Sequence, residues 1–147
     1  MSHPARAPVL QVAEPPAPYL ARPPLVVDCS AIAGMVFREH WEDQARLRIA
    51  GHTLHAPHLL MNEIASVTLQ KLRRGEAHAA AGLAEVARLD IELHPTDPPS
   101  VIELAQRYQL SAYDAAYLWL AADLRCPLAT FDDRLAAAAR EHLSQLE

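Results

Sequence analysis

Short apolar runs alternate with helical patterns along most of the chain. The runs at 25–27 and 127–129, and the extended segments at 53–56 and 91–94, predict short strands. Apolar residues at helical spacing predict helices at about 30–38, 41–50, 58–74, 76–89, 96–108, 112–124 and 132–143. Strands that alternate with helices are typical of an α/β fold, in which helices cover both faces of a central, mostly parallel sheet. The pattern therefore predicts a three-layer α/β domain.

The first 24 residues lack this pattern. They hold seven of the twelve prolines and no periodic apolar positions, so we predict a disordered or extended arm at 1–24 and a folded domain at 25–147. The prolines interrupt any secretory signal, and no apolar run approaches the roughly 20 residues of a membrane span. We expect a cytoplasmic protein without membrane contact, in which Cys29 and Cys126 form no disulfide.

Four acidic residues stand where this fold would direct them toward one region. Asp28 ends the first predicted strand, Glu63 lies in the helix at 58–74, Asp114 opens the helix at 112–124, and Asp132 follows the last strand. Ligands of open α/β sheets bind beyond the carboxyl ends of the strands, where Asp28 and Asp132 fall. Carboxylate oxygens select Mg²⁺ or Mn²⁺. The arrangement predicts a divalent-metal site.

Three of these acids also have a structural interpretation, which stays open. A short acidic side chain at a helix start accepts hydrogen bonds from first-turn amides, and Asp28 and Asp132 could act in this way. Asp114 follows Ser111 at the spacing of a capping box. Asp133 has the same spacing from Thr130 and competes with Asp132 as the fourth acid.

Glu63 is harder to explain as a surface residue. On a helical wheel it lies between Leu59 and Val67, beside an apolar flank where an unpaired carboxylate is unfavourable. The alternative is a solvated glutamate at the border between the apolar and polar faces of the helix, because that border is not sharp.

Four motifs around these acids resemble those of the PIN-domain ribonucleases in order and spacing. The resemblance covers about residues 25–143, and within the family it is greatest to VapC-type toxins of type II toxin–antitoxin systems, although such toxins usually begin almost at the first strand. The motifs are Val26-Val27-Asp28-Cys29-Ser30, Asn62-Glu63-Ile64-Ala65, Ser111-Ala-Tyr-Asp114-Ala-Ala-Tyr-Leu118 and Thr130-Phe-Asp132-Asp-Arg-Leu135.

The resemblance implies a PIN-like fold and an endoribonuclease that depends on Mg²⁺ or Mn²⁺. Asp28, Glu63 and Asp114 would be the primary metal ligands, and Asp132 would complete the site directly or through water. Ser30 and Thr130 would orient carboxylates by hydrogen bonds. The implied partners are an RNA substrate, an antitoxin protein and a second copy of the chain. The alternatives are an inactive PIN-like binding module and a phosphatase on a similar sheet.

Charge and other motifs change this interpretation little. The formal net charge of −5 argues weakly against a nucleic-acid partner, but twelve of the thirteen basic residues are arginine, which pairs well with phosphate. His52, His55 and His58 recur every three residues, but the segment between them looks extended, so they predict no shared helix face and no zinc site. No glycine-rich phosphate loop or paired-cysteine motif occurs.

Overall fold

The sheet of the computed structural model has five strands in the order β1-β5-β2-β3-β4. The structure describes residues 7–15, 22–37 and 41–146. Strands β2, β3, β4 and β5 are mutually parallel, and β1 pairs antiparallel with β5 at one edge. The strands are β1 (Gln11–Ala13), β2 (Pro24–Val27), β3 (Thr53–Pro57), β4 (Ile91–His94) and β5 (Leu128–Thr130).

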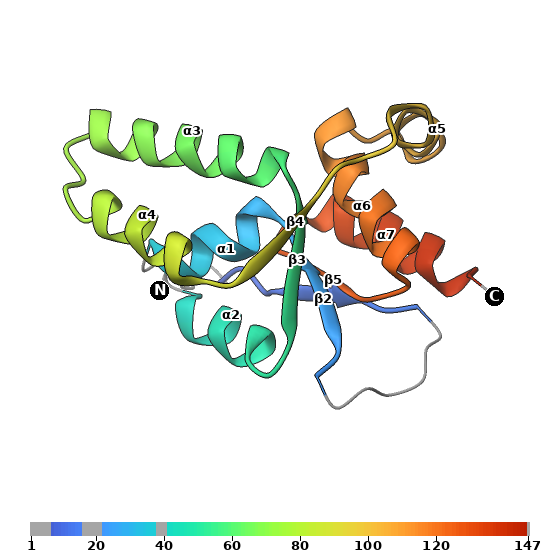
Figure 1. The fold of residues 1–147 in the computed structure, drawn as a ribbon, viewed down its shortest axis with the longest axis horizontal. Helices are drawn as coiled ribbons and strands as arrows, with labels where there is room; N and C mark the ends of the chain where they lie inside the picture. The colour runs from blue at the N-terminus through green and yellow to red at the C-terminus, as the bar shows by residue number, and fades with distance from the viewer. Residues whose placement is uncertain (1–6, 16–21, 38–40, 147) are drawn as a thin grey trace, which may run out of the picture.

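Helices cover both faces of this sheet (Figure 1). On one side lie α1 to α4, where α1 and α3 contact strands and each other, and on the opposite side lie α5 to α7, where α6 and α7 contact strands. This arrangement confirms the predicted three-layer α/β fold. The helices are α1 (Cys29–Val36), α2 (Glu42–Ile49), α3 (Leu59–Arg73), α4 (Ala79–Arg88), α5 (Pro98–Tyr108), α6 (Ala112–Leu124) and α7 (Asp133–Ser144).

The core forms where the two helical layers meet the central strands. Val26 and Val27 in β2 and Leu128 in β5 are fully buried, as expected for parallel strands that are covered on both faces. Leu60 of α3 and Leu118 of α6 are also fully buried. The continuous apolar runs of the sequence are therefore the two central strands.

Local signals fix the starts of several helices. The Asp97 side chain accepts a hydrogen bond from the Ser100 amide at the start of α5, which has proline in its first turn. Ser111 caps α6 by accepting from the Asp114 amide at 3.1 Å. Helix α6 ends at Arg125, which has a φ of 51°, in the left-handed region typical of helix ends.

The structure differs from the sequence-based expectation at the N-terminal segment. We expected no regular element before Leu25, but Gln11–Ala13 forms β1. The Gln11 side chain also donates a hydrogen bond to Asp133 and accepts one from Arg140. The rest of the predicted arm at 1–6 and 16–21 lies outside the described residues, as does the predicted helix end at Arg38.

The remaining predicted elements agree with the structure to within a few residues. The largest shift is in α4, which starts at Ala79 instead of about 76 because Glu76 and its neighbours form a turn. Both cysteines are free, as expected. No helix among the described residues is long and apolar enough to cross a membrane.

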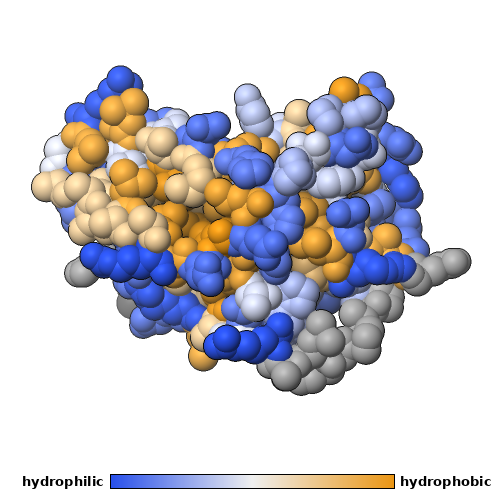
Figure 2. All heavy atoms as spheres, in the orientation of Figure 1, coloured by the Kyte–Doolittle hydropathy of each residue, from blue (hydrophilic) through white to orange (hydrophobic). Residues whose placement is uncertain are grey.

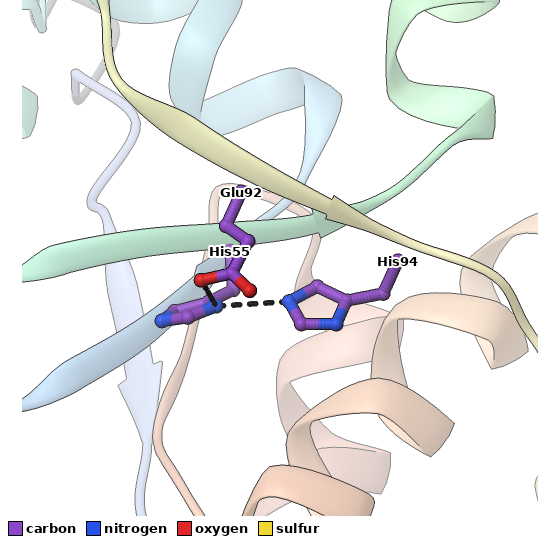
Figure 3. A group of neighbouring side chains, drawn as sticks. All are labelled: His55, Glu92 and His94. Atoms are coloured by element: carbon purple, nitrogen blue, oxygen red, sulfur yellow. Dashed lines mark hydrogen bonds and ion pairs between the residues drawn. The ribbon is translucent and has the colours of Figure 1, made fainter.

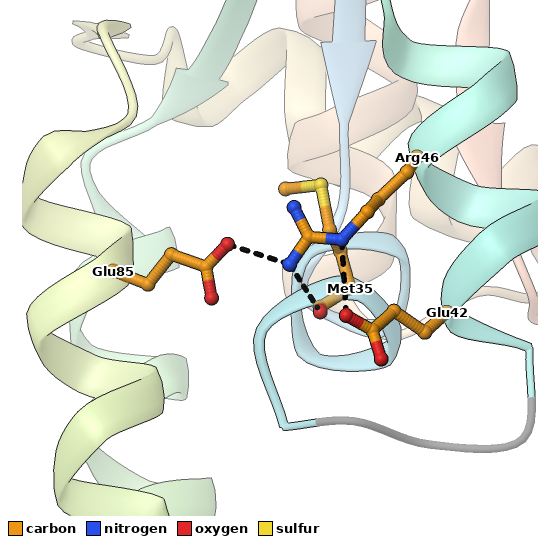
Figure 4. A network of polar contacts seen from close by, with 4 residues as sticks. All are labelled: Met35, Glu42, Arg46 and Glu85. Atoms are coloured by element: carbon orange, nitrogen blue, oxygen red, sulfur yellow. Dashed lines mark hydrogen bonds and ion pairs between the residues drawn. The ribbon is translucent and has the colours of Figure 1, made fainter.

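Polar contacts at the surface join three of the helices on one side of the sheet. The Arg46 guanidinium of α2 lies 3.0 Å from Glu42 and 2.7 Å from Glu85 of α4, and it also donates to the Met35 carbonyl of α1 at 3.3 Å (Figure 4). The Arg46 side chain is 42% exposed, so solvent screens these ion pairs. The network positions α2 and α4 but is not the main source of their stability.

Candidate metal centre at the carboxyl edge of the sheet

Two of the four predicted acids follow neighbouring parallel strands. Asp28 comes directly after β2, and Asp132 comes two residues after β5, which pairs with β2 through Val27 and Ala129. The Asp28 amide donates to the Ala129 carbonyl at 3.3 Å, so the two strand ends are joined by a backbone hydrogen bond. The carboxyl edge of the sheet thus brings these two segments together.

Asp28 is a buried carboxylate that three donors hold in place. Its Oδ1 accepts from the Ser30 hydroxyl at 2.7 Å and from the Ala31 amide at 2.9 Å, and its Oδ2 accepts from the Thr130 hydroxyl. The residue is only 5% exposed. A carboxylate has about four lone-pair positions, so three bonds leave room for a cation. Asp28 caps α1, as one interpretation predicted. The capping hydrogen bond still leaves the carboxylate a lone-pair position for a cation.

Burial makes the ionised form of Asp28 unfavourable. The pKa of Asp28 is raised to about 6: burial raises it most and the charge of Asp114 adds to this, while the hydrogen bonds from Thr130, Ala31 and Ser30 lower it. The carboxylate is therefore ionised at neutral pH but poorly compensated. A positive charge beside it would relieve this imbalance.

Electrostatic interactions link the four acids into one group, which we call the acid cluster: Asp28, Glu63, Asp114 and Asp132. Burial raises the pKa of the half-buried Asp114, and the charge of Asp132 raises it further. The hydrogen bond with Ser111 and the positive charge of Arg134 lower this pKa. Asp114 in turn raises the pKa of Asp28 and of Glu63. Asp114 thus interacts electrostatically with each of the other three acids, but no three of the four bring ligand oxygens within 4.8 Å of one another.

Glu63 is held by a buried tyrosine. Tyr117 of α6 is 1% exposed, and its hydroxyl donates to the Glu63 carboxylate at 2.6 Å. Burial raises the pKa of the half-buried Glu63, while this hydrogen bond lowers it. Glu63 is therefore not the fully solvated residue of the alternative interpretation. Sequence analysis did not assign Tyr117 a role, although its place one turn after Asp114 on α6 was visible.

The cysteine beside Asp28 has no reactive character. Burial raises the pKa of Cys29 to about 12, and the charges of Glu63 and Asp28 add to this effect. The thiol stays protonated at neutral pH and cannot serve as a nucleophile or a thiolate ligand. The chemistry of this region therefore belongs to the carboxylates.

The structure distinguishes the two candidates for the fourth acid by their contacts. Asp132 caps α7 by accepting from the Leu135 amide at 2.8 Å, and its charge acts on Asp114. The Asp133 carboxylate instead accepts a hydrogen bond from the Gln11 side chain of β1. Thr130 does not cap at Asp133: its hydroxyl accepts from the Asp132 amide at 3.0 Å. Ser30 and Thr130 both donate hydrogen bonds to Asp28.

A second group of ligand-type side chains was missed in the sequence. His55 of β3 lies beside Glu92 and His94 of β4, and one ligand atom from each lies within 4.8 Å of the others. The histidines considered in the sequence were neighbours along the chain, whereas these three meet across a strand pair. The sequence did contain one indication of this group: Glu92 and His94 are two residues apart in a predicted strand, which places them on the same face.

The comparison with known families identifies the fold. The model of the PIN domain matches residues 25–141. The chain belongs to the PIN-domain family. Ribonuclease VapC9 of Mycobacterium tuberculosis and VapC ribonuclease Mb0985 of Mycobacterium bovis are each 39% identical over 119 residues, which cover 76% of this chain and 87% of the relative. Ribonuclease VapC3 of Pyrobaculum aerophilum is 32% identical over 120 residues, with 76% and 92% covered.

A solved structure agrees with this family assignment. The crystal structure of PAE2754 from Pyrobaculum aerophilum matches this PIN domain with a TM-score of 0.62 and 24% identity, over 78% of each chain. At this identity the likeness shows the fold alone. The PIN-like α/β fold and the family that the motifs indicated are both confirmed.

Proposed function

We propose that this PIN-domain protein is a Mg²⁺- or Mn²⁺-dependent endoribonuclease, the toxin of a toxin–antitoxin pair that acts on RNA in the cytoplasm. The observation that carries the proposal is the acid cluster: the charge of Asp132 raises the pKa of Asp114, and the charge of Asp114 raises the pKa values of Asp28 and Glu63. Relatives named VapC ribonucleases that match most of their own length support the choice of RNA as substrate.

The residues fit a hard divalent cation. The ligand atoms are carboxylate oxygens. Several negative charges that are buried or half-buried near one another are unfavourable in free energy unless a cation neutralises them. Asp28, Glu63 and Asp114 would bind the ion as primary ligands, and Asp132 would bind directly or through water. When bound, the ion activates water and neutralises charge on the scissile phosphate.

The chain's own side chains supply the positioning. Ser30 and Thr130 fix the Asp28 carboxylate from both oxygens, and Tyr117 fixes Glu63. These hydrogen bonds also favour the ionised carboxylates, because they lower the pKa values of Asp28 and Glu63. The Asp28 and Glu63 carboxylates are therefore already oriented, and the acids would have to draw closer together to bind one cation, because no three of them bring ligand oxygens within 4.8 Å of one another.

An antitoxin and a second copy of the chain are the proposed protein partners. Apolar side chains are exposed on neighbouring helices of one layer: Met61, Leu69 and Leu72 of α3 and Leu83 of α4. Figure 2 shows hydrophobic atoms gathered over this part of the molecule, at the upper left. An apolar surface of this kind supports a protein partner.

The decisive experiment is cleavage of total bacterial RNA by the purified protein with Mg²⁺ or Mn²⁺. Asp28→Asn and Asp114→Asn should each abolish cleavage, as should EDTA. Asp123→Asn is the matched control, because Asp123 is an exposed acid on the same helix as Asp114. Metal-independent cleavage would contradict the metal role. Absence of cleavage and of Mg²⁺ binding would favour the inactive binding module, and turnover of small phosphomonoesters alone would favour a phosphatase.

A further inference from the structure

The parallel pairing of β3 and β4 aligns three metal-ligating side chains. His55 is the partner of Glu92 in the strand register, and His94 pairs with Pro57 two residues farther along. Residues two apart in a strand point to the same face, so Glu92 and His94 both lie on the side of the sheet toward which His55 points. Figure 3 shows the three side chains directed toward one another. We call them the histidine cluster.

The distances within the histidine cluster match those of a metal site. His55 Nδ1 lies 2.9 Å from His94 Nε2 and 3.6 Å from the Glu92 carboxylate. In a tetrahedral zinc site with metal–ligand bonds of about 2.0–2.1 Å, neighbouring ligand atoms lie about 3.3 Å apart. The Glu92 side chain is 68% exposed, so its carboxylate can rotate to adjust the third distance.

A hydrogen-bond partner on the far side of the ring can accept from the tautomer that a metal needs. His55 Nε2 lies 3.3 Å from the Thr53 hydroxyl. A metal-binding histidine usually donates its other ring N–H to such a partner, which leaves the ligating nitrogen with a free lone pair. With the proton on Nε2, His55 directs the lone pair of Nδ1 at the point where His94 and Glu92 converge.

We propose that His55, His94 and Glu92 bind a Zn²⁺ ion that joins the edge strand β4 to β3. Imidazole nitrogens suit Zn²⁺ and other late transition metals better than Mg²⁺, and two histidines with one glutamate are a known zinc ligand set that leaves a position for water. The two groups share no residue, and the charges that act on His55 are those of Glu92 and His94 and not those of the acid cluster. The exposed Glu92 gives the ion access from solvent.

The test is Zn²⁺ binding by the full-length protein without a histidine tag. Excess Mg²⁺ is present, so that it competes with Zn²⁺ for the carboxylates of the acid cluster. Zn²⁺ affinity would be measured by calorimetry, and Co²⁺ would report four-coordinate nitrogen and oxygen ligation by its visible absorption. We expect one equivalent bound, and a rise of the thermal midpoint with Zn²⁺. His94→Ala should weaken binding by about 100-fold or more, because loss of outer partners alone weakens metal sites by about 10–100-fold.

Two further variants keep the result interpretable. Glu92→Gln alters an exposed side chain, so it should fold normally and weaken Zn²⁺ binding by about tenfold or more. His58→Ala removes the exposed histidine between β3 and α3 and should bind as the wild type. Asp28→Asn should also retain Zn²⁺ binding, which separates this site from the acid cluster whether or not the protein cuts RNA. Binding that survives both His94→Ala and Glu92→Gln, or no binding below millimolar Zn²⁺, would overturn the proposal.

Discussion

Replacement of Asp28 by asparagine should stabilise the metal-free protein at neutral pH. The buried carboxyl has a pKa of about 6 against a reference of 3.8, so the folded state holds its proton more tightly than the unfolded state. Stability therefore falls as the pH rises through this interval and then stays constant. Asparagine has nearly the same shape and carries no charge, so it avoids this penalty, but it replaces the oxygen that accepts from Thr130 with an amide donor.

The magnitude follows from the pKa shift. The difference of about 2.2 pKa units corresponds to about 3 kcal/mol at pH 7.5, because one unit is worth about 1.36 kcal/mol. At pH 4.5 most of the folded-state carboxyl is protonated, and the same linkage gives about 1 kcal/mol. The advantage of Asp28→Asn over the wild type should thus grow by about 2 kcal/mol between these pH values.

Urea unfolding in EDTA at pH 4.5 and 7.5 measures this difference. Asp123→Asn is the control, because it makes the same substitution at an exposed position on α6. Mg²⁺ should then stabilise the wild type at pH 7.5 and have much less effect on Asp28→Asn. If Asp28→Asn is less stable than the wild type by the same amount at both pH values, the carboxylate is not under electrostatic strain and the reasoning fails.

Three further changes test the packing and the positioning contacts. Gly82→Ala should destabilise the protein by about 1–3 kcal/mol in thermal unfolding, because a Cβ there would lie 2.5 Å from the Phe37 ring. Tyr117→Phe should move the acidic limb of the pH profile of RNA cleavage to higher pH. The Tyr117 hydrogen bond lowers the pKa of Glu63 in the wild type, so its removal raises that pKa. Arg46→Ala should change the free energy of unfolding, measured by urea titration, by less than about 1 kcal/mol, because its ion pairs are exposed.

The sequence predicted the strands and helices whose signals are local. The apolar runs of β2 and β5, and the helix starts at Asp97 and Ser111, depend on residues within one turn or one strand. Strand β1 has no such signal: its three residues lie among prolines and become a strand through pairing with β5. Long-range pairing decided this element, and the local pattern could not reveal it.

The same distinction applies to the candidate sites. The acid cluster was predictable because each acid sits in its own local motif at a strand or helix end. The histidine cluster depends on the register between β3 and β4, which pairs His55 with Glu92. A shift of one residue would turn Glu92 and His94 to the opposite face. Side-chain patterns along each strand do not fix that register, so the sequence alone could not bring these residues together.

The N-terminal strand bears on which acid completes the cluster. Gln11 of β1 bonds both Asp133 and Arg140, which ties the first strand to α7. The Asp133 carboxylate thus accepts a hydrogen bond from β1. The charge of Asp132, in contrast, acts on Asp114. If the acids bind a cation, Asp132 is therefore the better placed of the two. The segment before Leu25 thereby gives Asp133 a hydrogen-bond partner on β1, whereas Asp132 has none there among the described residues and acts on Asp114.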